Sequence, residues 1–69
     1  MTTDQIKEVL INAGIKNLKE FGYPNVNKKN ILTDDIYSQF FLNMLKENAG
    51  QATPQVDSAI LQLIKTIQQ

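Results

Sequence analysis

The chain has 69 residues, of which 42% are hydrophobic, and its seven lysines balance seven acidic residues. A chain of this length forms a single domain, and without cysteine or histidine it has no disulfide and none of the usual soft metal ligands. The zero net charge and the lack of arginine argue against a nucleic-acid partner, because such binding depends on neutralising phosphates. Stability must therefore come from apolar packing within residues 1–69, alone or with a second copy of the chain.

The N-terminal segment does not look like a targeting signal. It carries Asp4, Lys7 and Glu8 where a signal peptide needs a basic start followed by an unbroken apolar run. No stretch approaches the roughly 18 apolar residues of a membrane span. We therefore expect a cytoplasmic protein with no membrane partner.

The first predicted helix covers residues 4–21, and Thr2 with Gln5 fits a capping box at its start. Gly14 lies between two apolar stripes, where it lets another backbone approach closely. Because a helix with two such stripes needs two partners, it either touches both other helices or keeps one stripe for a second chain. The stripes are Ile6, Val9, Leu10, Ala13 and Phe21, and Ile11, Ile15 and Leu18.

The segment 23–32 is predicted to be an ordered loop. Gly22 and Pro24 end the first helix, since glycine accepts the left-handed conformation and proline blocks continuation. Three asparagines and a lysine pair then favour turns, while Val26, Ile31 and Leu32 are available to hold the loop against the core. A single helical turn near residues 28–31 is compatible with this pattern.

The second predicted helix begins with Thr33 as its N-cap. Asp34 and Asp35 then occupy the first turn, where the helix dipole favours carboxylates. An apolar arc of about 180° indicates a helix half sunk in a core, and we expect this helix to organise the fold. The arc consists of Ile36, Tyr37, Phe40, Phe41, Met44 and Leu45.

The third predicted helix follows a turn that contains Gly50. Thr53 is its expected N-cap, and Pro54 is its first residue, where the missing N–H is not needed. One stripe of about 140° runs along it, and Leu61 lies outside that stripe. The stripe contains Val56, Ala59, Ile60, Leu63, Ile64 and Ile67. Together the elements predict an all-α fold, a small three-helix bundle with an ordered loop between helices 1 and 2.

The sequence offers little for catalysis. Ser38 and Ser58 have no basic neighbour at helical spacing, and helix capping accounts for the adjacent Asp34 and Asp35. That pair also lacks the spaced oxygen ligands and the glycine of a calcium loop. We therefore predict no catalytic residues, no cofactor and no metal.

A minimal helix-turn-helix-like DNA-binding domain is the alternative reading. The short turn at Gly50 joins two helices as in that motif, and the second would enter the major groove. Asp57 near the start of this helix and Lys65 as its only cation argue against phosphate contacts. The base-reading candidates would be Gln51, Thr53, Gln55 and Ser58.

Surplus apolar surface is the feature that points towards a function. One apolar stripe per helix is enough to fill the centre of a bundle of this size. The first helix nevertheless has a second stripe, and Leu42 and Leu61 lie off the main apolar faces. The stripe either mediates a homodimer or covers another element of the same chain, and both accounts stay open. Core packing is the stronger account of the aromatic rings, although so wide an arc has room for one partly exposed ring beside Met44. The candidate interaction surface is Ile11, Ile15, Leu18, Lys28, Lys29, Leu42 and Leu61.

The middle of the chain carries two short motifs, followed by aromatic and apolar residues. It reads Gly22-Tyr23-Pro24-Asn25-Val26 and Asn30-Ile31-Leu32-Thr33-Asp34, followed by Tyr37, Phe40-Phe41 and Met44-Leu45. Over residues 18–48 the chain thereby resembles short, uncharacterised helical proteins of bacteriophage and prophage genomes. The resemblance transfers no site residue, but it implies a small accessory protein of a kind that often binds a host or phage protein. We therefore expect a non-catalytic protein–protein interaction module, an adaptor or inhibitor that buries an apolar patch against a partner protein.

Overall fold

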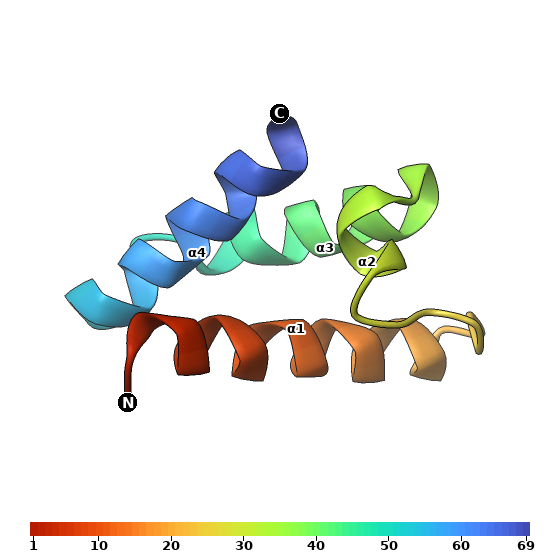
Figure 1. Ribbon diagram of the computed structural model, residues 1–69, viewed down its shortest axis with the longest axis horizontal. Coiled ribbons are helices and arrows are strands. Elements are labelled where there is room, and N and C mark those ends of the chain that lie inside the picture. Colours follow the sequence, from red (N-terminus) through yellow and green to blue (C-terminus); the bar gives the residue numbers. More distant parts are fainter.

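The computed structural model describes residues 1–69 as four helices without a strand. These are α1 (Thr3–Glu20), α2 (Asn30–Thr33), α3 (Asp35–Asn48) and α4 (Pro54–Gln68). Figure 1 shows α1 along one side of the molecule and the other three helices on the opposite side. The predicted all-α class is confirmed, but there are four helices and not three, because residues 30–32 of the expected loop form α2 together with Thr33.

The start of α1 is the predicted capping box. The Thr2 hydroxyl accepts from the Gln5 backbone N–H at 3.2 Å, and the Gln5 side-chain oxygen accepts from the Thr2 N–H at 2.8 Å. The helix ends at Glu20, one residue earlier than expected. Gly22 follows with φ +103°, the left-handed conformation that turns the chain back.

The N-cap of α3 is Asp34, so the prediction of Thr33 was wrong by one residue. Thr33 is the last residue of α2, and the Asp34 N–H completes that turn by donating to the Asn30 carbonyl at 2.8 Å. Asp34 is therefore the first residue after α2 whose backbone is extended. Its carboxylate accepts from the N–H groups of Ile36 and Tyr37 at 3.0 and 3.1 Å.

The start of α4 agrees with the sequence prediction. Thr53 is the N-cap, its hydroxyl accepts from the Val56 N–H at 3.4 Å, and Pro54 is the first helical residue. Gly50, with φ +81°, makes the preceding turn. None of the four helices has the length and apolar character needed to cross a lipid bilayer.

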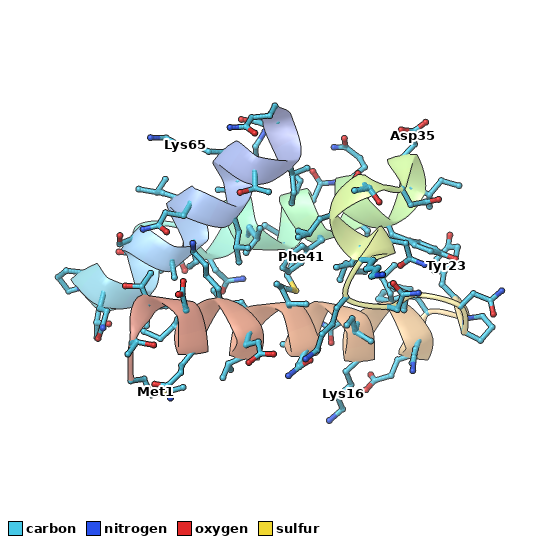
Figure 2. The ribbon with its side chains drawn as sticks, in the orientation of Figure 1. Met1, Lys16, Tyr23, Asp35, Phe41 and Lys65 are labelled. Carbon is cyan, nitrogen blue, oxygen red and sulfur yellow. The ribbon has the colours of Figure 1, made fainter.

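The core lies between α1 and the layer of the other helices. α1 packs against α4, and α4 also packs against α3. The Phe41 ring is fully buried at the centre (Figure 2), and Val26 and Ile31 hold the 23–32 segment to the core as predicted. The buried cluster comprises Leu18, Val26, Ile31, Phe41, Leu45, Ile60 and Leu63.

Two asparagines explain the order of the connection before α2. The Asn27 side chain accepts from the N–H groups of Lys29 and Asn30, each at 2.9 Å. The Asn30 side chain accepts from the Asn27 N–H at 2.7 Å and donates to the Asn25 carbonyl at 3.0 Å. These reciprocal bonds satisfy the backbone of a segment that has little regular structure of its own.

Candidate interaction surface

The seven residues of the predicted interaction surface do not gather on one surface. Leu18 is 0% exposed and Leu42 is 6% exposed, so neither is free to meet a partner. Ile11 and Ile15 are half-buried and pack against the core cluster. Since α1 contacts α2, α3 and α4, its second stripe is used within the chain. Of the apolar members only Leu61, on α4, is well exposed, at 53%.

The two lysines of the predicted surface differ in their contacts. Lys28 Nζ lies 2.8 Å from Glu8 Oε1 and attaches the loop to α1. The hydrogen bond from Lys28, and then its charge, hold the pKa of Glu8 below the usual value. Lys29 is exposed and forms no ion pair. Lys28 is therefore engaged within the molecule, and Lys29 is not.

Four of the five aromatic side chains form two contacts between the end of α1 and α3. The rings of Phe21 and Phe40 meet edge-on with centroids 5.2 Å apart, and those of Tyr23 and Tyr37 are 5.7 Å apart. Edge-on contacts are a preferred arrangement of aromatic pairs. Phe21 nevertheless remains 72% exposed. A large apolar ring is thus held in place by a neighbour while most of its surface meets water.

A groove of about 340 Å³ lies beside the Phe21–Phe40 pair, between α1 and α3. The Asn17 side-chain amide donates to the Met44 sulfur at 3.2 Å and links the two helices there. Three apolar side chains, two amides and one carboxylate line the groove. We call this site the aromatic groove, and it consists of Asn17, Phe21, Phe40, Asn43, Met44 and Glu47.

Helical spacing explains why these six residues share one site. On α1, Asn17 and Phe21 are four residues apart and lie on the same face. On α3, Phe40, Met44 and Glu47 are separated by four and three residues, so they form one row. The sequence did not identify Phe21 as a site residue, because its ring was assigned to the first apolar stripe of the first predicted helix. The available signal was the wide apolar arc of α3, which left room for an exposed ring beside Met44.

A second depression lies between the start of α3 and the end of α4. It is larger, about 720 Å³, but four of its six lining side chains are polar. It therefore offers less apolar surface for a partner than the aromatic groove does. Its lining residues are Asp35, Ser38, Gln39, Leu42, Ile67 and Gln68.

Three of the four base-reading candidates already make hydrogen bonds within the chain. Thr53 caps α4, the Gln55 amide donates to the Met1 carbonyl at 2.7 Å, and the Ser58 hydroxyl accepts from Gln62 at 3.4 Å. Gln51 is exposed on the turn. The side chains that would read bases are thus mostly used to hold α4 and its neighbours in place.

The polar and titratable side chains lie at the surface. No charged or polar side chain is buried, and no three acidic side chains gather into a set that could hold a metal ion. Comparisons with protein-family models, with curated proteins and with solved structures find no match.

Proposed function

We propose that this chain is a non-catalytic protein–protein interaction module of the cytoplasm, which binds a partner protein through the aromatic groove. The observation that carries the proposal is Phe21, which is 72% exposed while its ring contacts Phe40. Burying the exposed part of a phenylalanine ring contributes roughly 3 kcal/mol at ~25 cal/mol per Å². Because Phe40 already limits the motion of the ring, binding costs little side-chain entropy.

The composition of the groove supports the same function. Protein interfaces commonly combine a central aromatic anchor with a polar rim. Here Phe21 and Phe40 supply the anchor, Met44 supplies an adaptable floor, and Asn17 and Asn43 supply polar groups. The resemblance of residues 18–48 to small phage and prophage proteins points to the same class of accessory, adaptor or inhibitor protein.

The test compares two exposed apolar residues, Val9 on α1 and Phe21 directly after its end. Phe21→Ser removes the anchor, and Val9→Ser is the matched control, because Val9 is 55% exposed and does not line the groove. Proteins captured from a cell lysate by the unmodified chain are compared with those captured by each variant. A protein lost with Phe21→Ser and kept with Val9→Ser is then purified for measurement of its dissociation constant.

We expect Phe21→Ser to weaken that complex by about 30-fold, which corresponds to about 2 kcal/mol. Val9→Ser should leave it within about threefold. Both variants should melt within a few degrees of the unmodified chain, because both side chains are largely exposed. Retention of every captured protein by Phe21→Ser would overturn the proposal. A concentration-dependent mass in sedimentation that Phe21→Ser abolishes would identify a second copy as the partner.

A further inference from the structure

We infer that the aromatic groove accepts a basic side chain of the partner, arginine in preference to lysine, presented next to an apolar residue. This inference rests on the proposed function and names the chemistry of the partner. It is carried by the charge of the groove, by the exposed face of Phe21 and by an amide oxygen that has no donor within the chain.

The only charged group that lines the groove is the carboxylate of Glu47. The ion pairs of the molecule are Lys7 with Asp4 and Lys28 with Glu8, so Glu47 has no cationic partner within the chain. Glu47 is exposed, and its carboxylate lines a site that it shares with three apolar side chains, so a partner that covers this site would shield its cation from water. An acidic side chain would meet repulsion at the same position.

The lysines nearest in sequence do not supply that cation. Lys16 precedes Asn17, but its side chain points away from the core on the outer side of α1 (Figure 2). Lys46 precedes Glu47, but neighbouring residues on a helix point about 100° apart, and Lys46 does not line the groove. The negative charge of the groove is therefore left for a partner.

The aromatic ring provides a second attraction. A ring that is 72% exposed presents at least one face to solvent, and the electron-rich face of phenylalanine attracts cations. Guanidinium stacks on such a face more readily than ammonium does, because it is planar and more weakly hydrated. Met44 lines the same groove and offers an apolar surface for the methylene stem of the partner's basic side chain.

The amides of the groove provide a third attraction for a basic side chain. The Asn17 amide nitrogen is directed to the Met44 sulfur, and no donor within the chain reaches the Asn17 side-chain oxygen. In Asn43 the oxygen already accepts from Gln39 at 3.3 Å. Asn17 therefore offers a free acceptor in the groove that the carboxylate of Glu47 also lines. Arginine has five N–H donors in a fixed fork and can bond to both groups at once.

The test uses blocked dipeptides as probes and does not require an identified partner. N-acetyl-Leu-Arg-amide, N-acetyl-Leu-Lys-amide, N-acetyl-Leu-Gln-amide and N-acetyl-Leu-Glu-amide are titrated at millimolar concentration into the ¹⁵N-labelled chain. The side-chain amide resonances of Asn17 and Asn43 report on the groove itself. The variants are Glu47→Gln and, as the matched control, Glu20→Gln, which removes the same charge from an exposed residue outside the groove.

We expect the arginine probe to shift both amides and to bind about fivefold more tightly than the glutamine probe, with lysine between them. Glu47→Gln should remove most of this preference and Glu20→Gln should keep it. The preference should also shrink as salt is added. These results together would support the inference.

The inference is overturned if the glutamate probe binds as tightly as the arginine probe, if Glu47→Gln leaves the preference intact, or if no probe shifts the two amides. It is also overturned if dilution of the chain alone shifts them, since a second copy would then fill the groove. None of these outcomes depends on the comparison of Phe21→Ser with Val9→Ser. Failure of the arginine preference and failure of the interaction surface are thus measured separately.

Discussion

The ring of Phe41 lies directly against the backbone of Gly14. A Cβ atom at Gly14 would stand 2.7 Å from Cδ1 and 2.8 Å from Cε1 of Phe41, and 3.0 Å from Cδ1 of Ile31. Two of these separations are shorter than real Cβ contacts allow, and the ring that they involve is fully buried. The glycine in the middle of α1 thus sets how closely the other helices approach it.

We predict that Gly14→Ala destabilises the protein by up to about 2 kcal/mol. Alanine improves helix propensity by about 1 kcal/mol, but overpacking a closed core costs about 1–3 kcal/mol. Urea unfolding measures the resulting change in the free energy of unfolding. Asn12→Ala, at an exposed position of the same helix, is the control and should be neutral or slightly stabilising. The account fails if Gly14→Ala raises the melting temperature as much as the control does.

The cap of α3 provides a second prediction. Asp34→Ala should cost about 1 kcal/mol, because two backbone N–H groups lose their acceptor. Thr33→Ala should cost about 0.5 kcal/mol or less, since the Thr33 hydroxyl makes a single exposed bond to the Lys29 carbonyl. Thermal unfolding followed by circular dichroism measures both. If Thr33→Ala were the more damaging change, Thr33 would be the cap after all.

Two leucines of the sequence-predicted surface should behave oppositely. Leu18→Ala should cost about 2–5 kcal/mol, because Leu18 is fully buried. That approaches the whole stability of a chain this short. Leu61→Ala should stay within about 0.5 kcal/mol, because Leu61 is largely exposed. Melting curves of the two variants are sufficient, and similar losses at both positions would contradict the assignment of Leu18 to the core.

The contact between Lys28 and Glu8 makes a small part of the stability depend on pH. Because folding lowers the pKa of Glu8 from 4.5, the ion pair contributes above that pH and is lost as the pH falls through the folded value. Lys28→Ala should raise the pKa of Glu8 towards 4.5, as followed by NMR of the side-chain carboxyl. Lys29→Ala should leave it unchanged, since Lys29 makes no ion pair. An unshifted Glu8 in the Lys28 variant would contradict the contact.

The sequence predicted the long helices because their signals are local. The capping box at Thr2, Thr53 with Pro54, and the glycines at 22 and 50 act on neighbouring backbone, and each appears in the structure as expected. The four-residue α2 is too short to show a helical period. It also depends on bonds between asparagine side chains, which a hydrophobic pattern does not contain.

The candidate site was harder to predict, because periodicity identifies the apolar faces of a helix but not what covers them. Ile11, Ile15 and Leu18 form a real stripe, and the structure uses it inside the chain. Phe21 belongs to the other stripe, yet it lies at the last turn of α1, beyond most of the packing, and stays in solvent. That difference depends on where the neighbouring helices end, which is a tertiary property.

Gly22 has a role beyond ending α1. Its positive φ returns the Tyr23 N–H to the Leu18 carbonyl at 3.1 Å, while no atom lies within 4 Å of the place where a Cβ would be. The reversal brings Tyr23 to Tyr37 on α3, two residues after Phe21 meets Phe40. A side chain at Gly22 would meet no steric obstacle, but the positive φ would be strained, and the contact of Tyr23 with Tyr37 follows directly on this turn. The placement of the Tyr23–Tyr37 pair thus depends on a residue that has no side chain of its own.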